Sequence, residues 1–270
     1  MIDAARFADL LAGYCLEVET GQQVLVRSTP LAAPLLLELQ RAILERGAWP
    51  LLRVDLPGQV EGFYAHARDW QLDEFPELAL LEARKANATL SIQAPENTRA
   101  LTGIDPARMA RVARAREPIR EQTLRRRWCT TLWPTQANAQ QAGASLAAFE
   151  AFVSRALFLD QPDPVRSWGE LRAFQDELIG RLRTARELRI EAEGTDLRLS
   201  VKGRTWVNSD GRRNMPSGEV FTGPLETSAN GTITFDVPSG PAGVDVAGVR
   251  LRFEDGVVVE ARAERGDDYL

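Results

Sequence analysis

The residues with the clearest potential for chemistry lie in one turn-rich segment, 208–224, with the sequence NSDGRRNMPSGEVFTGP. Within it, Glu219 follows a glycine and opens a short β-prone run, so its carboxylate is expected where a loop enters a strand. A carboxylate held on such a rigid base is a suitable oxygen ligand for a divalent cation. The alternative is an exposed loop glutamate paired with Arg212 or Arg213. Glu219 is our candidate metal ligand, and the segment alone leaves both interpretations open.

Other residue types that bind metals or act as nucleophiles are scarce. His66 is the single histidine, so this chain alone cannot complete a mechanism that needs two. Gly-x-Ser-x-Gly, Cys-x-x-Cys and the glycine-rich nucleotide-binding motifs are absent from the sequence. Cys15 and Cys129 are too few for a disulfide framework, which is typical of a reducing compartment. We therefore expect a cytoplasmic protein, and we assign no catalytic nucleophile, structural zinc site or nucleotide cofactor.

Arginines are concentrated between residues 108 and 127. Arg108, Arg111 and Arg114 are three residues apart, which makes one helical face basic. Such a face could contact phosphates of RNA, or it could be a solvated face paired with Glu117 and Glu121. The formal net charge of −5 and the lack of interleaved aromatic residues argue against a nucleic-acid partner. No apolar stretch is long enough to predict a membrane span.

Strand-like and helix-like segments alternate over residues 1–185. The strand candidates are short apolar or β-branched runs, at residues 22–28, 50–55, 88–93 and 127–133. Helical patterns lie between and after these runs, at residues 30–47, 105–126 and 134–183, with a weaker helix ending at residue 66. This alternation predicts parallel strands joined by right-handed crossovers. We expect an α/β domain over residues 1–185, with an open, mostly parallel sheet flanked by helices.

Residues 186–270 have a different pattern. Short runs that alternate apolar and polar residues predict half-buried antiparallel strands, at residues 187–194, 196–202, 231–237, 249–254 and 256–263. Glycine-containing pairs, including Asn230-Gly231 and Asp255-Gly256, are turn signals between them. The last strand candidate ends close to Leu270, without a closing helix. We expect a β-rich, mainly antiparallel second domain over residues 186–270 that is only partial, within a larger parent protein.

Two ordered blocks of sequence carry a family resemblance. The first is NMPSGEVFTGP at residues 214–224, followed by Glu226 and Gly231. The second starts with WPTQ at residues 133–136 and continues through AGASLAAFEAFVSRALFLD to Asp163-Pro164 and Trp168. Together they resemble the thermophilic metalloaminopeptidase family, the leucyl aminopeptidase T group of peptidase family M29. The resemblance extends over essentially the whole chain.

The resemblance implies a metal-dependent aminopeptidase that removes N-terminal residues from peptides and forms homodimers. It implies two ions of zinc or cobalt per site, bound by two glutamates, two histidines and an aspartate. Glu219 matches the first glutamate ligand, whereas the family's other ligands fall beyond Leu270. We therefore expect an N-terminal portion of such an enzyme, comprising the α/β domain and the first part of the catalytic domain, and inactive alone. The alternative is a non-catalytic binding or dimerisation module that kept the fold.

Overall fold

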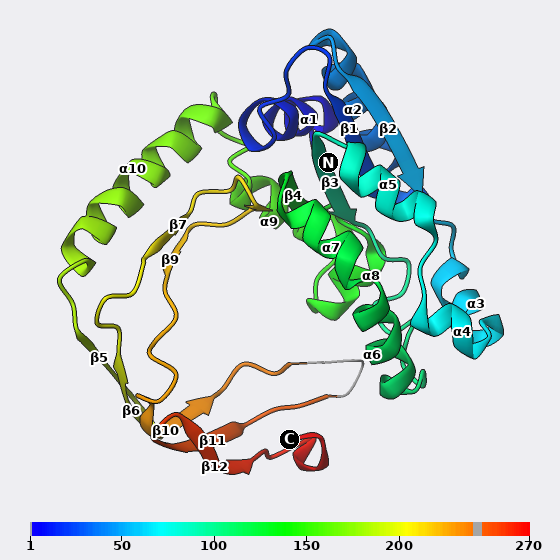
Figure 1. Ribbon diagram of the computed structural model, residues 1–270. Coiled ribbons are helices and arrows are strands. Elements are labelled where there is room, and N and C mark those ends of the chain that lie inside the picture. Colours follow the sequence, from blue (N-terminus) through cyan, green and yellow to red (C-terminus); the bar gives the residue numbers. More distant parts are fainter. Residues whose placement is uncertain (1, 240–244) are drawn as a thin grey trace. The chain divides into compact units, whose positions relative to one another are not determined.

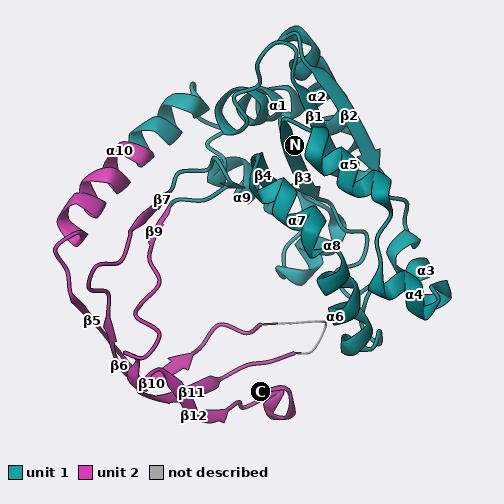
Figure 2. Cartoon of the chain, in the orientation of Figure 1, with its two compact units in different colours: residues 1–171, 209–218 teal, residues 172–208, 219–270 magenta. Residues whose placement is uncertain are grey.

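The computed structural model describes residues 2–239 and 245–270. The chain forms two compact units (Figure 2). Unit 1 comprises residues 1–171 and 209–218, and unit 2 comprises residues 172–208 and 219–270. The units therefore interleave along the sequence. The division into domains at 1–185 and 186–270 stays a prediction about which parts fold independently.

Unit 1 is built on a five-stranded sheet whose paired strands are all parallel, in the order β2-β1-β3-β4-β8. Its strands are β1 (Gln23–Ser28), β2 (Trp49–Val54), β3 (Ala88–Gln93), β4 (Arg127–Leu132) and β8 (Asn214–Met215). Four of the five coincide with predicted strands. The expected α/β architecture with a parallel sheet is confirmed.

Helices lie on both sides of this sheet (Figure 1). They are α1 (Ala4–Leu10), α2 (Ala33–Glu45), α3 (Gln59–His66), α4 (Asp69–Asp73), α5 (Glu77–Lys85), α6 (Pro106–Ala115), α7 (Glu117–Leu124), α8 (Gln136–Gln141) and α9 (Leu146–Ala156). α10 (Pro164–Leu182) starts in unit 1 and continues into unit 2. A π-helical turn, η1 (Leu11–Cys15), continues α1, and a 3-10 turn, η2 (Pro30–Ala32), precedes α2.

Strand β1 shows why both faces of the sheet must be covered. Val24 and Val26 point to one face and join the buried cluster that contains Phe7 of α1 and Leu39 of α2. Leu25 points to the opposite face and is also buried. A strand that buries successive side chains is typical of a parallel sheet between two helical layers. The continuous apolar run that predicted this strand therefore reflects burial on both sides.

Unit 2 contains a five-stranded antiparallel sheet in the order β12-β11-β10-β6-β5. Its strands are β5 (Glu187–Ala192), β6 (Thr195–Ser200), β10 (Asn230–Phe235), β11 (Val249–Glu254) and β12 (Val257–Arg262). Two further short strands, β7 (Val207–Ser209) and β9 (Glu219–Phe221), pair with each other. A 3-10 turn, η4, spans Asp267–Tyr269. The antiparallel, β-rich character predicted for this part of the sequence is confirmed.

One predicted turn is wrong. Asp255-Gly256 joins β11 to β12 as expected, but Asn230-Gly231 opens strand β10 instead of lying between strands. Gly231 has a φ of +118°, and a Cβ there would collide with the backbone carbonyl of Asp196 on β6. The glycine is thus needed because two strands approach closely at this position. An Asn-Gly pair looks the same in the sequence whether it serves a close approach or a hairpin turn.

Candidate functional site

The candidate ligand Glu219 comes directly after a closed loop, residues 209–218, that belongs to unit 1. The Gly218 amide donates a hydrogen bond to the Ser209 carbonyl at 3.0 Å. The hydroxyl oxygens of Ser209 and Ser217 are 2.6 Å apart. Between these ends the loop supplies β8, which pairs with β4 at the edge of the parallel sheet. The turn-rich sequence therefore folds as a loop that is fixed at its base and paired at its tip.

Side chains near the end of the first helix hold this loop. The Tyr14 hydroxyl donates to the carbonyl oxygen of Asp210 at 2.9 Å. The Arg212 guanidinium lies 5.2 Å from the centre of the Tyr14 ring, and its Nη1 is 3.0 Å from a carboxylate oxygen of Glu17. Burial, and then the nearby Asp210 carboxylate, raises the pKa of Tyr14 above its ordinary value. Tyr14 therefore keeps its proton at neutral pH and remains a donor to the loop.

Gly211 lets the loop lie directly against the core of unit 1. Its φ is +88°, in the left-handed region that disfavours side chains. A Cβ at this position would lie 2.7 Å from Cε of Met215 and 3.1 Å from the ring of Trp168. Both of these side chains are buried, and the Thr131 hydroxyl donates to the Met215 carbonyl at 2.6 Å. A side chain at position 211 would therefore strain the backbone and crowd the side chains of Met215 and Trp168.

Glu219 itself is exposed and is the first residue of β9. Its backbone carbonyl accepts a hydrogen bond at 2.6 Å from Nε2 of Gln175, a buried side chain of α10. Across residues 2–239 and 245–270, no described hydrogen bond or ion pair involves its carboxylate. Arg212 and Arg213, the alternative partners, are engaged elsewhere in unit 1. The backbone at Glu219 is therefore fixed, and its carboxylate has no partner among the described contacts. Its role as a metal ligand stays a prediction.

The metal-binding residue types do not gather around Glu219. In the part of the chain that the structure describes, no group of three or more His, Cys, Asp or Glu side chains is placed to hold a metal ion. Catalytic metal sites generally need at least three protein ligands to fix the geometry of the ion. The described residues therefore do not by themselves fit the two-ion site that the resemblance implies.

The single histidine is exposed, whereas the two cysteines are buried in surroundings that suit a structural role. His66 is exposed at the end of α3. Cys15 and Cys129 are free thiols, each buried in the core of unit 1. Burial, followed by contact with Cys129, raises the pKa of the Cys15 thiol well above its ordinary value. Because the thiolate is the reactive form, Cys15 is poorly suited to nucleophilic chemistry.

The predicted basic helix face is partly neutralised, but mostly by other residues than expected. Arg111 on α6 pairs with Asp69 and Asp73 of α4 at 3.0 and 2.7 Å. Of the two glutamates named from the sequence, Glu121 is 3.7 Å from Arg125. These contacts join α6 to α4, so part of the arginine pattern serves packing between helices.

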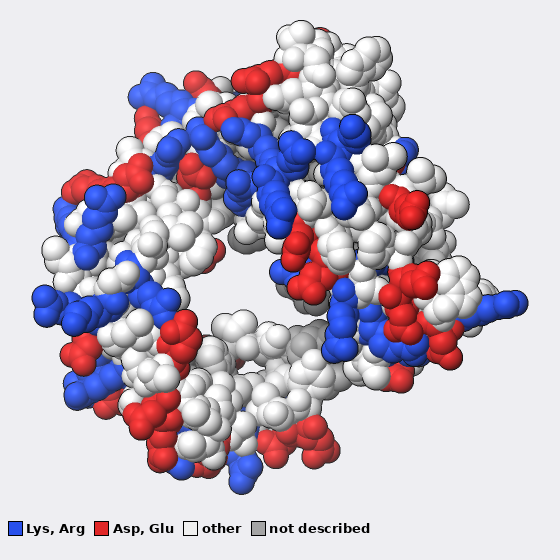
Figure 3. Space-filling model, in the orientation of Figure 1, with Lys and Arg blue, Asp and Glu red and all other residues white. Residues whose placement is uncertain are grey.

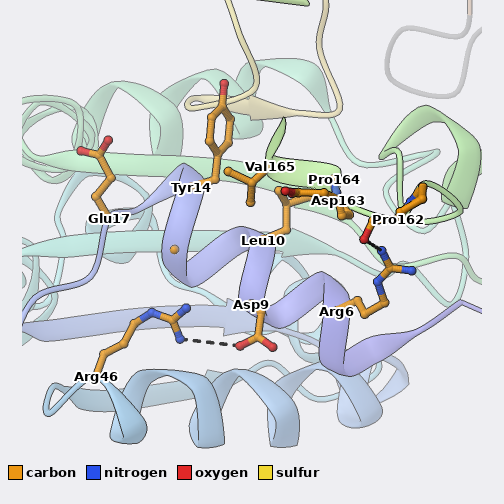
Figure 4. Close-up of a pocket in the computed structure, with 11 residues that line it drawn as sticks. Arg6, Asp9, Leu10, Tyr14, Glu17, Arg46, Pro162, Asp163, Pro164 and Val165 are labelled. Atoms are coloured by element: carbon orange, nitrogen blue, oxygen red, sulfur yellow. Dashed lines mark hydrogen bonds and ion pairs between the residues drawn. The ribbon is translucent and has the colours of Figure 1, made fainter. Parts of the chain in front are cut away.

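A cleft that the sequence did not predict lies in unit 1, beside the end of α1 (Figure 4). Its volume is about 600 Å³. Arg46 lies 3.6 Å from Asp9, and Arg6 donates a hydrogen bond to the carbonyl of Pro162 at 3.1 Å, so these polar groups of the cleft already have partners. The cleft therefore offers little free polar chemistry.

Comparison with known proteins identifies the class. The sequence matches the thermophilic metalloprotease (M29) family over residues 3–270, so the chain belongs to this family. It is 30% identical to Aminopeptidase 2 of Geobacillus stearothermophilus, over 98% of this chain and 71% of the relative. It is 33% identical to Aminopeptidase T of Thermus thermophilus, over 41% of this chain and 30% of the relative.

Solved structures support the same fold. Wild-type AmpT from Thermus thermophilus superposes with a TM-score of 0.83 at 24% identity, covering 98% of this chain and 72% of that one. A 2,5-dihydroxypyridine dioxygenase from Pseudomonas putida KT2440 is more distant, with a TM-score of 0.56 at 15% identity over 98% of this chain and 69% of that one. No helix in the described ranges combines the length and the apolar character that crossing a membrane requires.

Proposed function

We propose that this protein is an aminopeptidase that removes N-terminal residues from peptides. The observation that carries the proposal is the match to the M29 metalloprotease family over residues 3–270. The 30% identity to Aminopeptidase 2 over 98% of this chain supports the exopeptidase activity in particular.

The proposed activity depends on divalent metal, with two ions of zinc or cobalt per site and Glu219 as one ligand. The exposed carboxylate of Glu219 and its fixed backbone support this role. Bound metal would activate a water molecule and polarise the scissile carbonyl group. The described residues do not supply a complete ligand set. We therefore expect the 270 residues alone to be inactive.

The test is hydrolysis of an aminoacyl-p-nitroanilide with added zinc or cobalt, with and without a chelator. It is run on the 270-residue chain and on any longer form of the protein. Chelator-sensitive release of nitroaniline that requires a free α-amino group, and that Glu219→Gln removes, supports the proposal. Glu193→Gln removes the same charge from an exposed turn and is the matched control, which keeps full activity. Absence of turnover in every form with either metal contradicts it, and turnover by the 270 residues alone contradicts the proposed inactivity.

A second candidate function is a non-catalytic binding or dimerisation module. The single histidine, and the absence of a ligand group in the ranges the structure describes, favour this alternative. Homodimer formation and a cytoplasmic location are proposed for either function, and the two buried free thiols support a reducing compartment. Light scattering of the purified chain tests the dimer, and a monomer at micromolar concentration contradicts it.

A further inference from the structure

A cluster of exposed cations in unit 1 has no part in the hydrolysis proposed above. We name it the basic surface, and its members are Arg84, Lys85, Arg120, Arg125, Arg126 and Arg213. They come from the end of α5, from α7 and the residues after it, and from the loop before β8. Packing of α5 on α7 and pairing of β8 with β4 bring these segments together. Figure 3 shows Lys and Arg gathering over α7 and β4.

Hydrogen bonds fix two of these cations, Arg126 and Arg213, against backbone carbonyl groups of neighbouring members of the basic surface. Nη2 of Arg126 donates to the carbonyl oxygen of Arg84 at 3.2 Å. Nη1 of Arg213 donates to the carbonyl oxygen of Arg126 at 3.1 Å. The Arg213 guanidinium also lies 5.3 Å from the centre of the Trp128 ring. These acceptors are neutral, so the contacts orient the guanidinium groups and leave their charges intact.

The basic surface is poorly neutralised. Among its six residues, the described part of the chain gives an acidic partner only to Arg125, which is 3.7 Å from Glu121. Both of these side chains are more than half exposed, so the pair is weak. Cations at a helix C-terminus stabilise the helix, which accounts for Arg84 and Lys85 at the end of α5. Helix stabilisation does not account for Arg120 or Arg213.

We propose that the basic surface binds acidic peptides through their carboxylate groups. The proposal rests on the proposed function, which makes peptides the ligand class of this protein. Guanidinium groups form paired hydrogen bonds with carboxylates, and oriented guanidinium groups lose less entropy on binding. A nucleic acid is a weaker fit, because Arg213 occupies a face of Trp128, which is then closed to base stacking.

The test is fluorescence anisotropy with a labelled peptide rich in Glu and Asp. A second peptide carries Gln and Asn at the same positions. The triple variant Lys85→Gln, Arg120→Gln, Arg125→Gln should bind the acidic peptide about tenfold more weakly, since three exposed charge contacts are lost. The matched control Arg155→Gln, Lys202→Gln, Arg250→Gln removes the same charge from exposed positions elsewhere and should bind like the parent protein.

Salt should weaken binding of the acidic peptide and leave the neutral peptide unaffected. Equal binding of the two peptides, or equal weakening in both triple variants, overturns the proposal. Tighter binding of a single-stranded RNA of equal charge also overturns it, in favour of a nucleic-acid surface. The measurement needs no metal and no turnover. If the protein hydrolyses no peptide, the binding measurement can still confirm or refute the acidic-peptide surface. If hydrolysis occurs but acidic and neutral peptides bind equally, only the acidic-peptide proposal is refuted.

Discussion

Replacing Gly211 by alanine tests whether the loop 209–218 is locked onto unit 1. The backbone φ of +88° costs a non-glycine residue roughly 1 kcal/mol. The new Cβ would also lie 2.7 Å from Met215 and 3.1 Å from Trp168, both buried. Overpacking of this kind costs about 1–3 kcal/mol. Gly211→Ala should therefore reduce the free energy of unfolding by about 2–4 kcal/mol, or lower Tm by roughly 4–16 °C in a unit of this size.

A matched variant separates the two contributions. Gly21 has a φ of +80°, and a Cβ there would meet no atom within 4 Å, so Gly21→Ala isolates the backbone cost. Urea unfolding followed by tryptophan fluorescence measures both variants, and hydrogen exchange of residues 209–218 reports the loop directly. Equal losses for Gly211→Ala and Gly21→Ala, with unchanged exchange in the loop, would show that the loop does not press against the core.

Three further predictions concern side chains of unit 1. Tyr14→Phe removes a hydrogen bond to a backbone carbonyl and should destabilise by about 1–2 kcal/mol in urea unfolding, whereas an unchanged midpoint would refute the anchoring role. The hydrogen bond from Arg111 lowers the pKa of Asp73. The stability that this pair gives the folded state is therefore present above the unfolded-state pKa of Asp73 and is lost as pH falls through its folded-state pKa. In Arg111→Gln, NMR titration should give a higher pKa for Asp73, and an unchanged pKa would contradict the contact. Cys15 and Cys129 should react with a thiol reagent far more slowly in native protein than in urea, and equal rates would contradict their burial.

The parallel sheet could be predicted because its local signals agree with its tertiary environment. Residues 88–93 form β3 with the bounds expected from their apolar run, since this strand is paired on both sides and buried. Residues 249–254 likewise form β11, because alternation suits a strand with one exposed face. In these elements, periodicity and burial give the same information.

The surroundings of Glu219 could be predicted only in part. The start of a strand at residue 219 follows from local sequence, but β8 is only two residues long and exists because β4 accepts it. The anchoring partner Tyr14 lies 196 residues from Asp210, and Gln175 lies 44 residues from Glu219. No sequence pattern joins residues at such separations. The family resemblance located the ligand candidate, while the contacts that fix its backbone needed the structure.

The late return of the chain to add β8 also has a consequence during synthesis. A nascent polypeptide can assemble β1, β2, β3 and β4 early, yet the outer edge of β4 has no neighbour until residues 214–215 have left the ribosome tunnel. An open strand edge invites pairing with other chains. A fragment of residues 1–185 lacks β8, so the edge of its β4 would stay unpaired. We expect this fragment to aggregate more readily than the 270-residue chain.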